Sequence, residues 1–184
     1  MKVILLGGKK RSGKGVSATI VQTYYEEKGF SVYKTSFAEP IKEILSIMFD
    51  IPVSLINRYK NNPDKFKITI ENTENATDFR QLLQKLGTEV RDQYLYQTIW
   101  VDLCISKIKR KNTDIAIIDD WRFPFEYSIL CENFDVLPII VTRDTDEEDN
   151  HPSEKSLDDV SYATIIDNNG TIPELKDKLL KEII

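Results

Sequence analysis

The stretch that decides the fold is Val3-Ile4-Leu5-Leu6, followed closely by Gly8-Lys9-Lys10-Arg11-Ser12-Gly13-Lys14-Gly15. The apolar run is typical of a buried strand, and a helical pattern from Val16 to Lys28 follows the glycines. A strand that turns through glycines into a helix leaves several backbone N–H groups able to bind an anion. The sequence therefore predicts a phosphate-binding loop, with Lys14 reaching the phosphates as a compact positive charge.

The last position of this loop departs from the usual pattern. Ser or Thr normally stands there and supplies a hydroxyl to Mg²⁺, whereas this chain has Gly15. A glycine-rich turn with a solvated lysine is the alternative, but the strand before the loop and the helix after it favour phosphate binding. We expect a phosphate loop whose metal site lacks its usual hydroxyl.

Length and charge limit the remaining possibilities. The 184 residues are 41% hydrophobic, enough for one substantial core, so we expect a single domain over residues 1–184. Within it, residues 50–77 are expected to form a weakly structured insertion, either on the substrate side or as a plain surface loop, and residues 144–159 a lid-like segment. The net charge of -5 argues against polymeric nucleic acid as a partner and favours a small ligand.

Cysteine usage and hydropathy bear on the compartment. Cys104 and Cys131 form no close-spaced metal or redox motif, which suggests a reducing compartment. No apolar run approaches the roughly 18 residues of a membrane helix, and no signal-peptide pattern is found. We expect a cytoplasmic protein without a membrane partner. The sequence does not determine the oligomeric state, and a homodimer stays open.

Five short runs rich in β-branched residues alternate with helical patterns. They are Lys2–Leu6, Val32–Phe37, Ile115–Ile118, Val136–Val141 and Ala163–Ile166. This alternation predicts an α/β fold, a parallel sheet with helices on both faces and ligands beyond the carboxyl ends of the strands. Gly8, Asp119 and Arg143 fall at such ends.

A helix is predicted from Asp78 to Tyr94. Its apolar residues recur at spacings of three and four and form a buried stripe, namely Phe79, Leu82, Leu83, Leu86 and Val90. On regular α-helical spacing, the flank beside this stripe carries Arg80, Gln84, Gly87 and Arg91. Such a flank can line a nucleotide cleft, but taken alone it reads more readily as an ordinary boundary face.

The strand at Ile115–Ile118 ends in Asp119-Asp120-Trp121-Arg122. A carboxylate in this place can organise Mg²⁺ and its waters, although Asp-Asp after a strand is equally often a loop start or a helix cap. Because side chains alternate along a strand, at most one of the two carboxylates is expected to face a nucleotide. Glu126, four residues beyond Arg122, is placed to brace that arginine.

Taken in chain order, these motifs resemble the phage-type deoxynucleoside monophosphate kinases, a branch of the nucleoside monophosphate kinase fold. The resemblance runs nearly end to end, and Trp100 fits it as well. Its motifs are Gly8 to Lys14, Phe37-Ala38-Glu39-Pro40-Ile41-Lys42-Glu43, Arg80 to Glu89, Asp119 to Glu126, His151-Pro152-Ser153-Glu154 and Asn168 to Leu175.

The resemblance implies a three-layer P-loop NTPase fold with a five-stranded parallel sheet, a short lid and a monophosphate-binding insertion. It implies phosphoryl transfer from ATP, with Mg²⁺, to a (deoxy)nucleoside 5′-monophosphate, giving the diphosphate. The partner would be this small molecule, and the enzyme would be a phosphotransferase with a phosphate group as acceptor.

The resemblance also implies roles for individual residues. The ATP site would comprise Gly8, Lys9, Arg11, Ser12, Gly13, Lys14, Gly15 and Val16, with Asn168 and Gly170 near adenine. The monophosphate pocket would comprise Arg80, Gln84, Gly87, Thr88, Trp100, Asp120, Arg122 and Glu126. Lys14, Asp120, Arg122 and Arg143 would be catalytic, and Asp119 and Asp120 would hold Mg²⁺ indirectly.

Two departures from the family pattern keep alternatives open. The family usually has an acidic residue at Gly15 and a hydroxyl residue at Val16, for which Ser17 is the nearest replacement. The lid carries an acidic run, Asp144, Asp146, Glu147, Glu148 and Asp149, which would repel phosphate unless it points outward. The alternatives are a phosphomevalonate kinase-like enzyme, whose acceptor has no base, and a nucleotide-binding relative without turnover.

Overall fold

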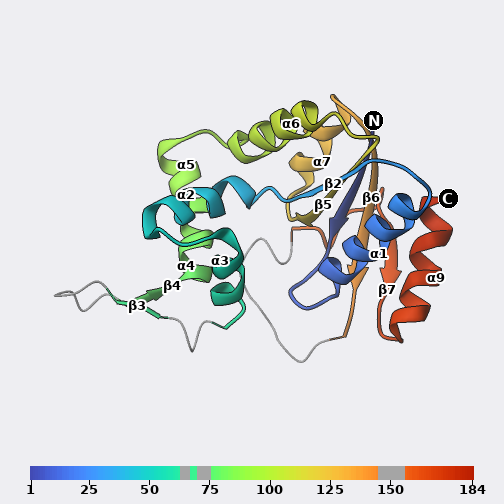
Figure 1. The fold of residues 1–184 in the computed structure, drawn as a ribbon, viewed down its shortest axis with the longest axis horizontal. Helices are drawn as coiled ribbons and strands as arrows, with labels where there is room; N and C mark the ends of the chain where they lie inside the picture. The colour runs from blue at the N-terminus through green and yellow to red at the C-terminus, as the bar shows by residue number, and fades with distance from the viewer. Residues whose placement is uncertain (63–66, 70–75, 145–155) are drawn as a thin grey trace. The chain divides into compact units, whose positions relative to one another are not determined.

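The computed structural model describes residues 1–62, 67–69, 76–144 and 156–184, which divide into two compact units (Figure 1). Unit 1 comprises Met1–Phe37 and Cys104–Ile184, and unit 2 comprises Ala38–Leu103. Unit 2 includes the whole of residues 50–77, the expected substrate-side insertion. The single domain over residues 1–184 stays a prediction.

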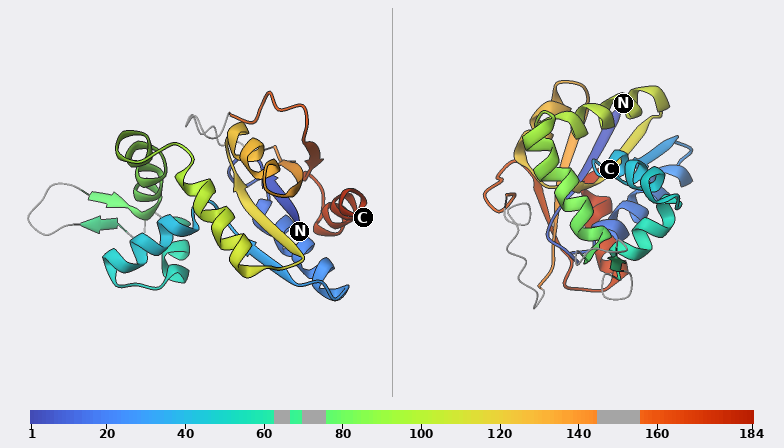
Figure 2. Two further views of the ribbon diagram at one scale, coloured as in Figure 1. Left: turned by 90° about the horizontal axis from the view of Figure 1, so that it is seen from above. Right: turned by 90° about the vertical axis from the view of Figure 1, so that its left-hand side faces the viewer.

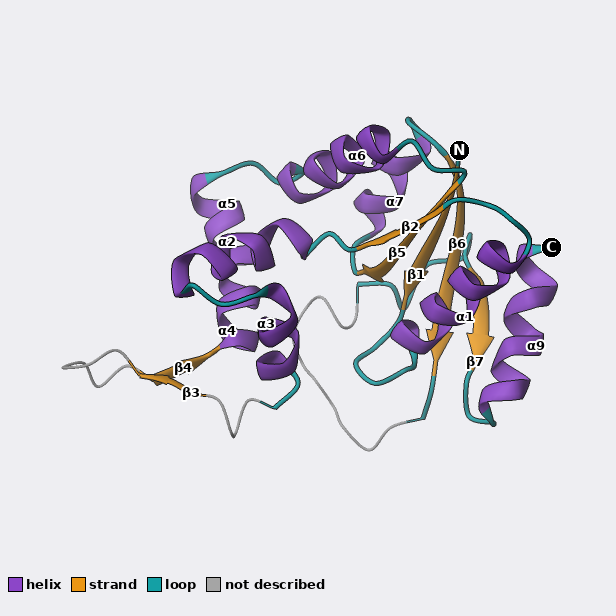
Figure 3. Cartoon of the chain, in the orientation of Figure 1, coloured by secondary structure: helices purple, strands orange, loops and turns teal. Residues whose placement is uncertain are grey.

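Unit 1 is built on a five-stranded parallel sheet in the order β2-β5-β1-β6-β7 (Figure 3). The strands are β1 (Lys2–Gly7), β2 (Val32–Thr35), β5 (Ile115–Trp121), β6 (Asp135–Thr142) and β7 (Thr164–Asp167). All five predicted strands are confirmed. β5 runs further than expected, so that Asp119 and Asp120 belong to the strand itself.

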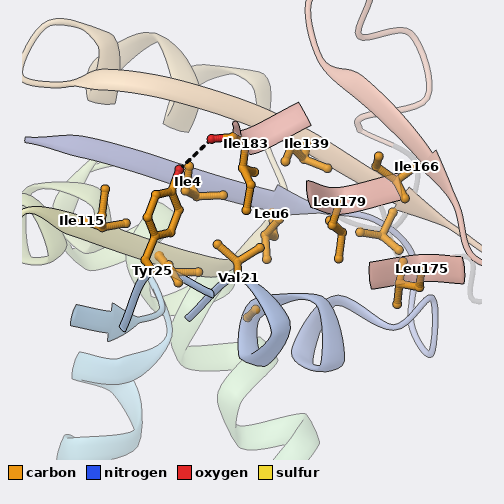
Figure 4. Packing of buried hydrophobic residues seen from close by; sticks show 13 residues of the cluster. Ile4, Leu6, Val21, Tyr25, Ile115, Ile139, Ile166, Leu175, Leu179 and Ile183 are labelled. Atoms are coloured by element: carbon orange, nitrogen blue, oxygen red, sulfur yellow. Dashed lines mark hydrogen bonds between the residues drawn. The ribbon is translucent and has the colours of Figure 1, made fainter. Parts of the chain in front are cut away.

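One face of this sheet packs against two helices. Helix α1 (Lys14–Glu27) and helix α9 (Ile172–Ile183) bury Val21, Tyr25, Leu175 and Leu179 against Ile4 and Leu6 of β1 (Figure 4). The Tyr25 hydroxyl donates to the backbone oxygen of Ile183 at 2.9 Å. This buried hydrogen bond ties the last helix to the helix that begins at the glycine-rich loop.

The other face is covered by α7 (Pro124–Cys131) and by the part of α6 (Ile99–Lys111) that begins at Cys104 (Figure 2). Because side chains alternate along β1, Val3 and Leu5 point to this side, and both are fully buried. A strand buried on both faces is typical of a sheet between helix layers. The predicted α/β class with helices on both faces is confirmed.

Unit 2 is mainly helical. It contains α2 (Glu39–Phe49), α3 (Val53–Lys60), a hairpin of β3 (Lys67–Thr69) and β4 (Ala76–Asp78), then α4 (Phe79–Gln84), a π-helical segment η1 (Lys85–Val90), α5 (Arg91–Tyr94) and the start of α6. Helix α3 lies where a weakly structured region was expected. Ile56 is fully buried and the ring of Tyr59 lies 5.5 Å from that of Phe79, so apolar residues three apart stabilise one short helix.

The lid-like segment is described only at its two ends. Arg143 and Asp144 follow β6, and Ser156–Asp159 form turns in which Leu157 is buried. The acidic run from Asp146 to Asp149 and the His151–Glu154 motif lie outside the described residues. Within the described part of the chain, no helix is long and apolar enough to cross a membrane.

Candidate phosphate-binding site

At two positions the turn after β1 has a backbone conformation that favours glycine. Gly8 and Gly13 adopt φ angles of 134° and 103°, in the region that side chains disfavour. A Cβ atom on Gly8 would meet the backbone oxygen of Val141 in β6, and one on Gly13 would meet the side-chain amide of Asn168. The loop therefore packs closely against β6 at Gly8 and against Asn168 at Gly13.

Two cationic side chains converge on this loop. Lys14, the first residue of α1, donates from Nζ to the backbone oxygens of Gly8 at 2.6 Å and Lys9 at 2.7 Å. Arg122, just beyond β5, donates from a guanidinium nitrogen to the same Gly8 oxygen at 3.3 Å. Positive charge from two distant parts of the chain is thus concentrated beside a loop that leads into a helix N-terminus, an arrangement that attracts phosphate.

The remaining loop residues differ in exposure. Ser12 is buried, and its hydroxyl has no hydrogen-bond partner among the described residues. Lys9 and Arg11 are exposed, and Lys9 lies 3.3 Å from the carboxylate of Asp158. Gly15 is exposed, and a Cβ atom added there would meet nothing within 4 Å.

The position of Ser17 shows whether its hydroxyl could replace the metal ligand that Gly15 and Val16 lack. Val16 is 45% exposed, whereas Ser17 is fully buried beside Ala18 on the face of α1 that packs on the sheet. The Ser17 hydroxyl has no partner in the part of the chain that the structure describes. It therefore does not share the exposed side of Gly15 and Val16, which argues against Ser17 as the replacement ligand for a metal.

Both carboxylates at the end of β5 have partners. A carboxylate oxygen of Asp120 accepts a hydrogen bond from the backbone N–H of Phe37 at 2.8 Å, and Asp119 lies 3.6 Å from the ammonium of Lys34. Among the residues described, no three His, Cys, Asp or Glu side chains gather as a metal site. The indirect magnesium role of the two aspartates stays a prediction.

Glu126 braces Arg122 through the backbone. Its side chain is buried, and one carboxylate oxygen accepts hydrogen bonds from the backbone N–H groups of Arg122 at 2.8 Å and Phe123 at 2.9 Å. These bonds fix the turn between β5 and α7 from which the guanidinium reaches the loop. The sequence indicated a contact between these two residues, and the structure shows which atoms make it.

The other expected pocket residues lie in unit 2 and gather around the π-helical segment. The indole N–H of Trp100, which is buried, donates to the backbone oxygen of Gly87 at 3.2 Å. The Thr88 hydroxyl donates to the backbone oxygen of Gln84 at 2.6 Å. Arg80 lies on α4, before this segment, and is partly buried. Unit 2 thus brings together Gln84, Gly87, Thr88 and Trp100, whereas Asp120, Arg122 and Glu126 belong to unit 1.

The predicted helix from Asp78 to Tyr94 is present but is not a regular α-helix. A carboxylate oxygen of Asp78 caps its start by accepting from the backbone N–H of Gln81 at 2.9 Å. Because η1 changes the helical repeat, the expected flank does not extend to Arg91, whose side chain is only 8% exposed. Arg91 bonds to Asp92 at 2.7 Å and lowers the pKa of that carboxyl. The sequence does carry a signal for this irregularity, because Gly87 and Thr88 are both poor helix formers.

Two expected ligand residues follow the last strands. Arg143 lies beyond the end of β6 and is exposed. Asn168, after β7, is buried, and its side-chain amide donates to the backbone oxygen of Ser12 at 2.8 Å. Gly170 is exposed two residues later. The structure thus brings Asn168 to the glycine-rich loop itself.

A model of the deoxynucleotide monophosphate kinase family matches residues 50–179. The chain belongs to this family. The family resemblance seen in the sequence and the P-loop kinase fold that it implied are therefore confirmed. The matched range includes η1, β5 and Asn168 but begins after the loop Gly8–Gly15, so the phosphate-binding interpretation of that loop rests on its sequence and geometry.

A curated relative is the deoxynucleoside-5'-monophosphate kinase of Escherichia phage T5. It is 32% identical over 85 residues, a stretch that covers 42% of this chain and 34% of the relative. The chain thus spans about a third of the length of the curated relative that it matches.

Replacing Glu126 by Ala tests the brace under Arg122. The substitution leaves two backbone N–H groups without their acceptor, so we expect a loss of about 1–3 kcal/mol in the free energy of unfolding. For a chain of this size that corresponds to a fall in Tm of roughly 2–4 °C per kcal/mol. The matched control is Glu132→Ala, at an exposed position just after the same helix. Equal Tm values for the two variants would contradict the assigned role.

Proposed function

We propose that the protein transfers the γ-phosphoryl group of ATP to the 5′-phosphate of a (deoxy)nucleoside monophosphate and releases the diphosphate. The observation that carries the proposal is the convergence of Lys14 and Arg122 on the Gly8 carbonyl, at the entrance to helix α1. Membership of the deoxynucleotide monophosphate kinase family supports the same reaction. The relative from phage T5 carries a matching name.

The reaction demands alignment and positive charge more than proton transfer. The acceptor is already an anion, so no strong general base is needed, and the transition state spreads negative charge over the transferred oxygens. Lys14 and Arg122, which contact backbone carbonyls in the structure, would exchange these contacts for phosphate oxygens. Arg143, beyond the end of β6, is proposed to add a further positive charge.

Unit 2 is proposed to bind the acceptor. Arg80 suits a phosphate, and Gln84 suits the edge of a base. Arg80 and Gln84 lie on α4, directly before the π-helical segment η1. This segment and the bond from Trp100 to Gly87 would fix the orientation of α4. π-Helical segments occur frequently at functional sites, which supports a ligand here. The indole N–H of Trp100 is engaged with the backbone, so its proposed contribution is to shape the pocket.

Mg²⁺ would be held through water by one of the two carboxylates, Asp119 or Asp120, because consecutive residues of β5 face opposite sides of the sheet and carboxylate oxygens suit this cation. When bound, the ion neutralises the charge between the β- and γ-phosphates. The position after Lys14 supplies no hydroxyl to the metal, because Gly15 has no side chain and the Ser17 hydroxyl is buried. That feature is the one observation favouring the second candidate, a relative that binds nucleotide without turning it over.

The direct test is a coupled assay for ADP formation with ATP, Mg²⁺ and each deoxynucleoside monophosphate, with mevalonate phosphate as the alternative acceptor. We expect turnover with at least one nucleotide, and a loss on the order of a hundredfold or more in Lys14→Met because its charge serves the transition state. Lys28→Met, at the other end of α1, is the control. ATP binding without turnover for any acceptor would overturn the kinase proposal and leave the binding relative.

Gly15→Ser tests the missing hydroxyl. The added side chain enters open space, so we expect a folded protein whose Mg²⁺ requirement for ATP binding falls several-fold. Gly15→Ala is the matched control, which gains up to about 1 kcal/mol of helix stability but no metal ligand. Calorimetric titration of ATP at graded Mg²⁺ concentrations measures the effect. Identical Mg²⁺ dependence in the two variants would contradict a metal site beside Gly15.

A further inference from the structure

Asn168 occupies the space directly behind the glycine-rich loop. Only 7% of it is exposed, and its backbone N–H donates to the Thr142 oxygen at 2.8 Å, which holds the residue between the ends of β6 and β7. Its side-chain Nδ2 donates to the Ser12 oxygen, also at 2.8 Å. The same nitrogen would clash with a Cβ atom on Gly13. The amide therefore contacts the Ser12–Gly13 peptide from one side.

This contact determines which way that peptide faces. In a trans peptide the C=O and the following N–H point in opposite directions. Since the Ser12 oxygen points toward Asn168, the N–H of Gly13 points away from Asn168. A buried polar group is stabilised when it has a hydrogen-bond partner. The bond between the Asn168 amide and the Ser12 carbonyl satisfies both groups, so both favour this orientation of the Ser12–Gly13 peptide.

We propose that Asn168 is a positioning residue. It holds the phosphate-binding loop in the conformation in which the Gly13 N–H faces the anion. This inference rests on the proposed function, because it takes the anion to be the phosphates of ATP. It differs from the adenine contact that the family resemblance implied for Asn168. An adenine contact would read the base, whereas a loop brace acts on the phosphates whatever base they carry.

The turn that carries Asn168 is fixed by contacts that do not touch the loop. Asn169 accepts from the backbone N–H of Asp144 at 2.9 Å and donates to the Asp167 carboxylate at 2.7 Å. The ammonium of Lys178 binds the same carboxylate at 3.0 Å and lowers the pKa of Asp167. Lys178 therefore offers a matched control, since its loss removes a contact of this turn but not the hydrogen bond from Asn168 to Ser12.

The experiment compares ATP with inorganic tripolyphosphate, which has the same phosphates and no base. Calorimetric titration of the full chain measures both affinities for the wild type, Asn168→Ala and Lys178→Met. We expect Asn168→Ala to weaken both ligands by the same factor, about tenfold, and Lys178→Met to change neither by more than about twofold. Weakening of ATP alone would show an adenine contact and overturn the inference. So would unchanged affinity for both ligands.

Asn168→Asp supplies a second variant of the same volume, which serves if the Ala variant does not fold. Its carboxylate would face the Ser12 oxygen without a donor, so we expect weaker tripolyphosphate binding at neutral pH than in the wild type. That deficit should shrink as the pH is lowered and the carboxyl takes up a proton, which restores an O–H donor. A deficit that does not change with pH would contradict the positioning role of Asn168.

A wild-type protein that binds neither ATP nor tripolyphosphate would overturn both the proposed function and this inference. A wild type that binds them, with Asn168 variants that bind equally well, would overturn the inference alone.

Discussion

The close approach of the backbone after β1 to its neighbours is the constraint on which the site depends. The carbonyl of Val141 and the amide of Asn168 leave no room for a side chain at Gly8 or Gly13. This packing fixes where α1 begins and where Lys14 emerges. It also leaves the Gly8 oxygen as a common acceptor for Lys14 and Arg122, so the geometry of one short turn sets the positions of both cations.

Much of the architecture follows from patterns that can be counted along the chain. The five strands were predictable because each lies in a short run rich in β-branched residues, and such runs alternating with helices indicate a parallel sheet. The glycine-rich loop was predictable because Gly8, Gly13 and Lys14 stand at fixed spacing directly after such a run. The family membership was equally accessible, because its motifs occur in the expected order.

Features that depend on tertiary contacts could not be derived in this way. The π-helical segment breaks the regular repeat at Lys85–Val90, and periodicity calculated for an α-helix then misplaces Arg91. The contact of Asn168 with Ser12 joins residues 156 positions apart, and no local pattern records it. Glu126 could be paired with Arg122 from spacing, but only the structure shows that the bond is made to the backbone.

The central claim is that the backbone of Gly8–Gly15 binds phosphate. The most direct measurement is a titration of the isotopically labelled chain with inorganic tripolyphosphate, followed through its backbone amide NMR signals. The account predicts that the largest shifts occur at Gly8–Gly15 and at the Asn168 side-chain amide that contacts this loop. Saturable binding whose largest shifts lie elsewhere in the chain, with the loop signals unmoved, would contradict it.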